Sequence, residues 1–227
     1  MTTGKPPLKK PARVLIVEDH PLVREGIRSR IEGEAGFVVC GEAADVADAL
    51  NQLERCSPDV AIVDISLKEG NGLDLIKRML SRQPGLRIIV SSMHEEIVYA
   101  ERALLIGAMG FVHKLESVET LLQALRDAVE GRIFASEAVI QRLLNRNMGR
   151  RQTSENCAAE IDVLTDRELE VFECIGRGQD IKSIANQMHL SPKTVETYRD
   201  RIRHKLSIAS AHELKHFAFQ WVNDHLS

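Results

Sequence analysis

The sequence predicts a doubly wound α/β domain with a five-stranded parallel sheet, followed by a small all-α domain. In the first half of the chain, five short apolar runs alternate with amphipathic helical patterns, which is the arrangement of parallel α/β sheets. Beyond residue 160 the strand patterns stop, and apolar residues recur only at helical spacing. The length of 227 residues suits two domains of ordinary size.

Each predicted strand is short and mostly apolar. Residues 60–63 are apolar throughout, which is typical of a strand buried on both faces of a sheet. A helical pattern follows every strand, beginning for example at Pro21, after the capping residue Asp45, and at Gly72. The five predicted strands are 14–17, 37–40, 60–63, 86–90 and 110–112, and the last two helices include 103–106 and 118–129.

The composition is that of a soluble globular protein, with 44% hydrophobic and 28% charged residues. No apolar run approaches the roughly 20 residues of a membrane-spanning helix. Residues 1–11 are rich in Lys and Pro and lack the apolar core of a secretory signal, so we expect a disordered lead-in and a cytoplasmic protein. The four cysteines form no C-x-x-C pair, which argues against a zinc ribbon or a disulfide framework.

Charge is distributed unevenly along the chain. Residues 13–131 contain 13 Lys and Arg against 20 Asp and Glu, a net charge of −7. Residues 193–205 instead carry a basic stripe that only Glu196 and Asp200 interrupt. An acidic front half and a local basic stripe indicate two different tasks. The basic residues of the stripe are Lys193, Arg199, Arg201, Arg203 and Lys205.

Charged and hydroxyl side chains follow the predicted strands at their carboxyl ends, where open parallel sheets bind ligands. Glu18 and Asp19 follow the first strand, Asp64 the third, Ser92 the fourth and Lys114 the fifth. Three carboxylates at one edge repel one another and favour a divalent cation, and an all-oxygen site suits Mg²⁺. A carboxylate beside Mg²⁺ can attack phosphorus and form an acyl phosphate. The ordinary alternative for a lone strand-end Asp is a helix cap or turn residue.

This set of strand ends resembles the receiver domain of bacterial two-component response regulators, a flavodoxin-like fold, over roughly residues 12–131. The resemblance implies that Asp64 is the phosphoacceptor. It also implies that Glu18 and Asp19 hold Mg²⁺ together with Asp64, and that the backbone carbonyl of Ser66 is a further ligand.

The same resemblance assigns the residues that respond to the phosphoryl group. Ser92 is similar to the switch hydroxyl, with Ser91 as its nearest rival, and Lys114 to the phosphate-pairing lysine. Phe111 stands where receivers place the switch aromatic residue. The chain departs from the family at two positions where receivers often have proline, Lys68 and Leu115, and neither change removes a reacting group.

Residues 132–160 predict one helix and then a flexible linker. A short apolar repeat gives way to polar residues and glycine from about Asn145 to Glu160, which is typical of a tether between domains.

The last domain, residues 161–227, has the pattern of a helix-turn-helix. Thr165 and Glu168 form a capping box at the start of a helix that ends at Gly178. A short helix at 181–188 and a longer one from Ser191 follow, and the second bears the basic stripe. A plain helical bundle with a solvated basic face gives the same pattern.

Individual residues favour DNA binding. Leu164-Thr165-x-x-Glu168 and Leu190-Ser191-Pro192-Lys193-Thr194-Val195 resemble the LuxR-type helix-turn-helix, over about residues 161–221, although Tyr198 replaces a more usual His. A receiver followed by this module is the layout of NarL/FixJ-type response regulators. The resemblance implies a sensor histidine kinase and double-stranded DNA as partners, and a homodimer that forms on phosphorylation.

The resemblance also implies the DNA and dimer contacts. The start of the recognition helix would face the groove, and basic residues further along would contact phosphates. The expected groove residues are Lys193, Thr194, Glu196, Thr197 and Asp200, and the expected phosphate contacts are Arg199, Arg201 and Lys205. The expected pairing surface is the apolar face of the last helix, with Leu214, Phe217, Ala218 and Trp221.

Two enzyme functions fit single motifs. His212-Glu213-Leu214-Lys215-His216 matches the H-E-x-x-H zinc-protease signature, but the sequence offers no third ligand other than Asp224 or His225. An aspartyl-phosphate phosphatase would also use Asp64, yet those enzymes have a second acid two residues on, where this chain has Ser66. We therefore expect a regulator rather than a turnover enzyme.

Overall fold

The computed structural model describes residues 10–67, 70–93, 96–147, 161 and 163–225, and it divides the chain after Leu144 into two compact units. We call them the α/β unit and the helical unit. Nine of the eleven residues of the predicted lead-in lie outside the described residues, and so do residues 148–160 of the predicted linker.

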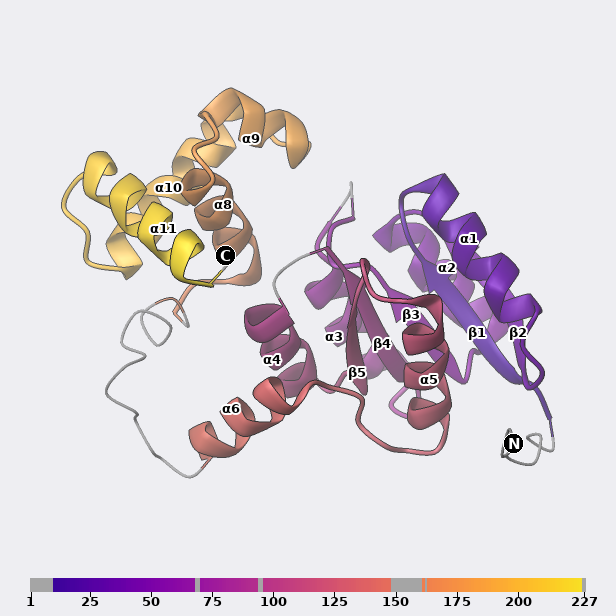
Figure 1. The fold of residues 1–227 in the computed structure, drawn as a ribbon. Coiled ribbons are helices and arrows are strands. Elements are labelled where there is room, and N and C mark those ends of the chain that lie inside the picture. The colour runs from indigo at the N-terminus through magenta and orange to yellow at the C-terminus, as the bar shows by residue number, and fades with distance from the viewer. Residues whose placement is uncertain (1–9, 68–69, 94–95, 148–160, 162, 226–227) are drawn as a thin grey trace. The chain divides into compact units, whose positions relative to one another are not determined.

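The α/β unit is built on five parallel strands in the order β2-β1-β3-β4-β5 (Figure 1). The inner strands β1, β3 and β4 are almost entirely buried, as expected for strands covered on both faces. From β1 the chain goes first to β2 on one side and then to β3 on the other, so the strand order reverses between β1 and β3. Open parallel sheets bind ligands at the carboxyl ends of the two strands that flank this reversal. The strands are Ala12–Val17 (β1), Phe37–Ala43 (β2), Val60–Val63 (β3), Arg87–Ser92 (β4) and Gly110–His113 (β5).

Helices cover both faces of this sheet, which confirms the predicted doubly wound fold. On one face, Ile31 of α1 and Leu121 and Leu125 of α5 join Val14 and Ile16 of β1 in one core. Helices α2, α3 and α4 cover the other face (Figure 1). The helices are Pro21–Glu32 (α1), Val46–Cys56 (α2), Gly72–Arg82 (α3), Glu96–Ile106 (α4) and Val118–Val129 (α5).

The loop after β3 is held tightly against the start of α3. Asn71 caps the helix by accepting hydrogen bonds from the backbone N–H groups of Leu73 and Asp74 at 2.8 and 3.2 Å. The next residue, Gly72, donates its N–H to the carbonyl of Ile65 at 2.9 Å. A side chain at Gly72 would lie 2.2 Å from the backbone oxygen of Asp64, so only glycine lets α3 begin this close to the strand end.

After α5, a short segment of backbone runs beside β5 before helix α6 begins (Glu137–Asn147). Phe134 donates to the carbonyl of Met109 at 2.8 Å and accepts from the N–H of Phe111 at 3.1 Å, so it lies beside β5. An ion pair of 2.6 Å between Arg142 of α6 and the buried Glu101 of α4 fixes the helix. Helix α6 continues to Asn147, two residues beyond the expected start of the tether at about Asn145.

The described residues of the helical unit, from residue 161 onward, form helices α8, α9, α10 and α11. The predicted capping box is present: the N–H of Thr165 donates to Glu168 Oε2 at 2.7 Å, and Thr165 Oγ1 accepts from the N–H of Glu168. Helices α9 and α10 form the predicted helix-turn-helix, joined by a turn in which His189 has a φ of 52°. The bounds are Asp166–Gly176 (α8), Ile181–Gln187 (α9), Pro192–Lys205 (α10) and Ala211–His225 (α11).

The apolar face of α11 builds the core of this unit. The ring of Phe172 on α8 lies 5.6 Å from Trp221 and 5.7 Å from Phe217, between ring centroids. Leu214, Ala218 and Trp221 are at most 1% exposed. The expectation that this face is open for pairing with a second chain needs correction, since its residues are used in packing α11 on α8. An apolar stripe predicts burial, but it does not say against which partner.

Candidate functional site

Four of the predicted site residues come together at the carboxyl edge of the sheet. Glu18 and Asp19 follow β1, Asp64 follows β3, and Lys114 follows β5. The three carboxylates are 1%, 6% and 1% exposed, in that order. Lys114 Nζ lies 2.8 Å from Asp64 Oδ2 and 2.6 Å from Glu18 Oε2. Residues that are far apart in the sequence therefore form one buried charged cluster.

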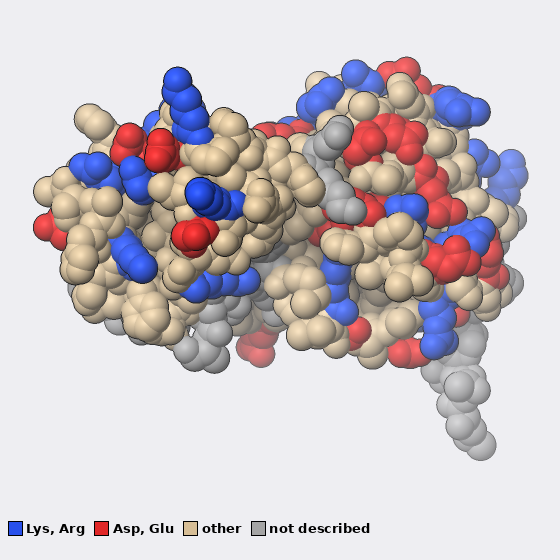
Figure 2. Space-filling model, turned by 90° about the horizontal axis from the view of Figure 1, so that it is seen from above, with Lys and Arg blue, Asp and Glu red and all other residues tan. Residues whose placement is uncertain are grey.

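The cluster carries more negative than positive charge. Burial by itself lowers the pKa of Lys114, but the Asp64 and Glu18 carboxylates outweigh it and hold this pKa above its ordinary value. Lys114 is thus charged at neutral pH and balances one of the three carboxylates. Asp and Glu side chains gather on the α/β unit in the view from above (Figure 2). The remaining buried negative charge matches the charge of one divalent cation.

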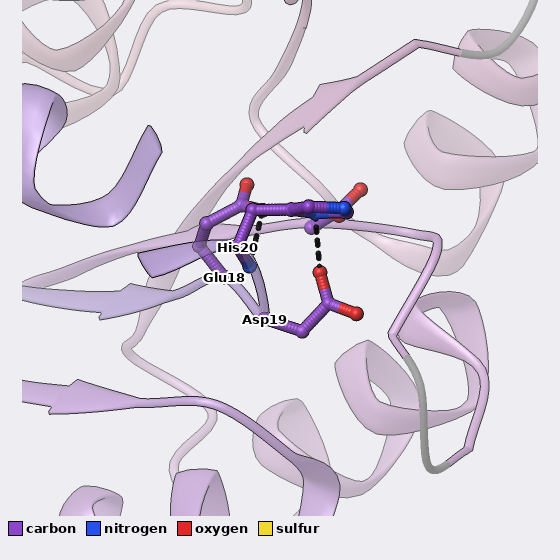
Figure 3. Close-up of side chains that lie close together, drawn as sticks. Glu18, Asp19 and His20 are labelled. Carbon is purple, nitrogen blue, oxygen red and sulfur yellow. Dashed lines mark hydrogen bonds and ion pairs between the residues drawn. The ribbon is translucent and has the colours of Figure 1, made fainter. Parts of the chain in front are cut away.

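The sequence reasoning missed His20 as a member of this cluster. Its Nδ1 lies 2.6 Å from Asp19 Oδ1 and 3.1 Å from Glu18 Oε1, and the ring is turned toward both carboxylates (Figure 3). One ligand atom from each of Glu18, Asp19, His20 and Asp64 lies within 4.8 Å of the others. Carboxylate oxygens fit Mg²⁺ well. The signal available in the sequence was the position of His20 directly after the acidic pair.

The other predicted site residues lie on or next to the same strands: Ser66 follows β3, Ser92 ends β4 and Phe111 is in β5. The N–H of Ser66 donates to Asp64 Oδ1 at 3.0 Å, which orients the carboxylate within its own loop. The N–H of Lys114 donates to the carbonyl of Ser92 at 2.8 Å and so joins the ends of β4 and β5. Ser92 and Phe111 are buried, at 0% and 1% exposed, and so is Ser91.

In the helical unit, α10 has one buried side and one exposed charged side. Val195 and Ile202 point into the core. Lys193, Thr197 and Arg201 are exposed, and they line a shallow hollow of about 310 Å³ together with Ser191, Thr194 and Tyr198. Glu196 and Asp200 are exposed as well, whereas Thr194 and Arg199 are half-buried. The residues expected to face DNA thus lie mainly on the solvent side of α10.

Lys205 has a partner within the helical unit. Its Nζ lies 2.6 Å from Glu168 Oε2 and donates to the carbonyl of Val163 at 3.2 Å. Burial raises the pKa of Glu168, but the hydrogen bonds from Lys205 and Thr165 outweigh it and lower the pKa below its ordinary value. Lys205 therefore ties the end of α10 to the start of α8.

The H-E-x-x-H motif has a structural role. Glu213 Oε2 accepts hydrogen bonds from the N–H groups of Ala209 and Ser210, both at 3.2 Å, at the start of α11. His212 and His216 are exposed. In the described part of the chain, neither belongs to a group of side chains that could hold a metal ion. This geometry does not support the protease alternative.

The fold and the two sites define a class of protein: a phosphoacceptor-type α/β unit linked to a helix-turn-helix unit. Residues 14–126 match the family described as response regulator receiver domain, and residues 162–218 match the family described as bacterial regulatory proteins, luxR family. The chain belongs to the response regulators with a LuxR-type DNA-binding domain, of the NarL/FixJ type. Such proteins regulate transcription in a phosphorylation-dependent way.

Known relatives match along nearly the whole chain. Response regulator GacA of Pseudomonas aeruginosa is 33% identical over 202 residues, which is 89% of this chain and 92% of that protein. Response regulator UvrY of Escherichia coli K12 is 31% identical over 207 residues, 91% of this chain and 93% of that protein.

A solved structure is similar as well. RcsB from Salmonella enterica serovar Typhimurium, bound to the rprA promoter with the phosphomimetic BeF₃⁻, has a TM-score of 0.60 and 27% identity. The match covers 92% of this chain and 98% of that one. In this chain, no helix among the described residues is both long and apolar enough to cross a membrane.

Proposed function

We propose that a histidine kinase transfers a phosphoryl group to Asp64 and that this modification controls DNA binding by α9 and α10. The observation that carries the proposal is the buried cluster in which Asp64 lies 2.8 Å from Lys114 and beside two further carboxylates. A buried acid surrounded by like charge and one lysine is poorly placed for a purely structural role, because its desolvation is only partly compensated.

Glu18, Asp19, Asp64 and the backbone carbonyl of Ser66 would hold Mg²⁺, which when bound neutralises charge on the oxygens of the transferring group. The Asp64 carboxylate attacks the phosphorus, and the bond from phosphorus to the donor nitrogen breaks. Lys114 keeps its charge in this pocket and pairs with the new phosphoryl oxygens. Ser92 donates its hydroxyl to one of them. The acyl phosphate stays attached to Asp64 and is not released, so the protein is not a turnover enzyme.

The signal leaves this site through β5. Movement of Ser92 and Lys114 toward the phosphoryl group shifts the ends of β4 and β5, which share the hydrogen bond between these two residues. Phe111 repacks in the same strand and changes the surface formed by α4, β5 and α5. Because Phe134 bonds to the backbone of Phe111, and α6 is bound to α4 through Arg142 and Glu101, the change reaches the segment that leads to the DNA-binding unit.

In the cytoplasm, the active form is a homodimer that binds two half-sites about one helical turn of DNA apart. The proposal draws support from the RcsB relatives, whose solved structures include dimers bound to DNA. Base contacts come from the exposed start of α10, and phosphate contacts from residues further along the helix. We assign the first role to Lys193, Thr194, Glu196, Thr197 and Asp200, and the second to Arg199, Arg201 and Lys205.

The test is phosphorylation of the full chain by a small phosphodonor with Mg²⁺, followed by intact-mass measurement. One phosphoryl group is expected on the wild type and none on Asp64→Asn. Asp74→Asn is the matched control, since Asp74 lies on α3 in an exposed ion pair with Lys77. Undiminished labelling of Asp64→Asn would show that another residue is the acceptor.

A second measurement links the modification to DNA. We expect phosphodonor to raise the DNA affinity of the wild type and to leave that of Asp64→Asn unchanged. A segment from about residue 160 onward is expected to bind DNA without phosphodonor. Equal affinity of the full chain and the segment, with and without phosphodonor, would contradict control by the α/β unit.

A further inference from the structure

Two cysteines that are distant in the sequence meet on the α2 side of the sheet. Cys40 lies in the edge strand β2 and Cys56 is the last residue of α2, and their sulfur atoms are 3.2 Å apart. The sulfur–sulfur bond of a disulfide is about 2.0 Å long, so an approach of about 1.2 Å would join them. We propose that Cys40 and Cys56 form an oxidant-responsive disulfide that locks the edge strand β2 onto α2.

An irregularity in the sheet creates this contact. The parallel register of β1 and β2 pairs Val14 with Val39 but Leu15 with Gly41, so Cys40 is an extra residue in β2. A bulge of this kind changes the direction of a side chain relative to simple alternation. At Gly41, an added Cβ would lie 3.2 Å from the Cys56 sulfur, which shows that the bulge brings β2 close to the end of α2.

The end of α2 is rigid, so the two sulfur atoms are held near each other. The guanidinium of Arg13 donates two hydrogen bonds, of 3.0 and 2.7 Å, to the backbone carbonyl of Cys56. The backbone N–H of Arg13 donates to the Asp59 carboxylate at 2.8 Å. The Cys56 thiol also donates to the carbonyl of Gln52 at 2.9 Å. These contacts tie Cys56, at the end of α2, to Arg13 of β1, the strand that neighbours β2.

The two thiols differ in access to solvent, which suits a two-step oxidation. Cys40 is half-buried, whereas Cys56 is buried, so we expect a small oxidant to react first at Cys40. Burial and the hydrogen bond to Cys56 raise the pKa of Cys40 to about 12, so little thiolate is present at neutral pH. We therefore expect oxidation of Cys40 to be slow at neutral pH.

With a peroxide as oxidant, the Cys40 sulfur attacks one oxygen, the O–O bond breaks, and Cys40 becomes a sulfenic acid while water leaves. The Cys56 sulfur then attacks the Cys40 sulfur. The S–S bond forms, the S–O bond breaks, and a second water leaves with the Cys56 proton. The two sulfur atoms together lose two electrons, which reduce hydrogen peroxide to two molecules of water.

The experiment uses the full chain with Cys157 and Cys174 replaced by serine, so that only Cys40 and Cys56 remain. After treatment with hydrogen peroxide, we expect a monomer that has lost two hydrogen atoms, and a linked peptide containing both cysteines by mass spectrometry. The unfolding temperature of the α/β unit should rise by about 10 °C, because the bridge closes a loop of about 15 residues. A thiol reductant should reverse this rise.

Cys40→Ser and Cys56→Ser in the same background are the matched controls, and each should show neither the mass change nor the rise in unfolding temperature. Peroxide-treated protein in which both thiols still react with an alkylating agent would overturn the proposal. So would a bridge that forms only between two chains, detected on a non-reducing gel.

Discussion

Each unit of this protein buries a carboxylate that is paired with a lysine, and the surroundings decide what the pair does. In the helical unit, Glu168 accepts from Lys205 and also from Thr165 in a capping box, so its charge is fully compensated. In the α/β unit, Lys114 is shared by Asp64 and Glu18, and Asp19 adds a third carboxylate. The first arrangement is complete and joins two helices. The second keeps excess negative charge and can receive a cation and a phosphoryl group.

The largest expected effect of breaking either pair is at Lys114. Lys114→Met leaves three buried carboxylates without their cationic partner, which should lower the free energy of unfolding of the α/β unit by about 3 kcal/mol in the absence of divalent cations. Mg²⁺ should recover more stability in this variant than in the wild type, because it meets more uncompensated charge. Hydrogen exchange of the β1, β3 and β5 amides, with and without Mg²⁺, measures both effects.

Lys77→Met is the control for this prediction. Lys77 forms an exposed ion pair with Asp74, so its loss should change the stability by about 0.5 kcal/mol or less. A Lys114 variant as stable as this control, in protein freed of divalent cations, would contradict the view that the cluster is electrostatically incomplete.

A smaller effect is expected where charge is exposed and free to bind a partner. Arg201 lies on the solvent side of α10, so Arg201→Ala should weaken binding to all DNA sequences about tenfold and reduce the salt dependence by about one phosphate contact. Thr197→Ala should instead change the preference among sites. The measurement is DNA affinity over a salt series with two unrelated sequences. A change of sequence preference in the arginine variant alone would reverse these assignments.

Sequence patterns predicted the residues that this comparison rests on, for a physical reason. The carboxyl ends of parallel strands meet at one edge, so Glu18, Asp64 and Lys114 could be brought together from the order of the strands alone. The capping box of Thr165 and Glu168 was equally predictable, because it depends on four consecutive residues. Local rules and sheet topology therefore account for the fold and for most of the candidate site.

Contacts that depend on side-chain direction were not predictable in this way. The partner of Lys205 is 37 residues away on another helix, and the charge pattern of α10 does not encode it. Cys40 meets Cys56 only because one extra residue interrupts the register of β2, and strand periodicity contains no sign of that bulge. The apolar stripe of α11 was recognised, but which helix it packs against depends on the tertiary fold.

Lys205→Met distinguishes the structural role of this lysine, its ion pair with Glu168, from its proposed contact with a DNA phosphate. It leaves Glu168 buried with only its capping-box bonds, and Lys205 itself is partly exposed, so the helical unit should lose about 1 kcal/mol of stability. Trp221 is the only tryptophan in the chain and is buried in this unit, so its fluorescence reports the unfolding of the unit in the full protein. If the salt dependence of DNA binding is unchanged in the variant, Lys205 has only a structural role. If the salt dependence is reduced, Lys205 also contacts a DNA phosphate.

The last and smallest expected effect is a dependence of stability on acid pH that belongs to the helical unit. The pKa of Glu168 is lower in the folded unit than its ordinary value of 4.5, so the charged carboxylate stabilises the folded state. This contribution is fully present above pH 4.5 and is lost as the pH falls through the lower pKa of the folded state. Denaturation followed by Trp221 fluorescence between pH 6 and pH 3 should show a decline that is weaker in Lys205→Met, because the variant has lost the main interaction that lowers this pKa. If wild type and variant declined in parallel, the ion pair with Lys205 would contribute nothing to the acid sensitivity of the unit, and the capping box alone would hold the Glu168 carboxylate in its charged form.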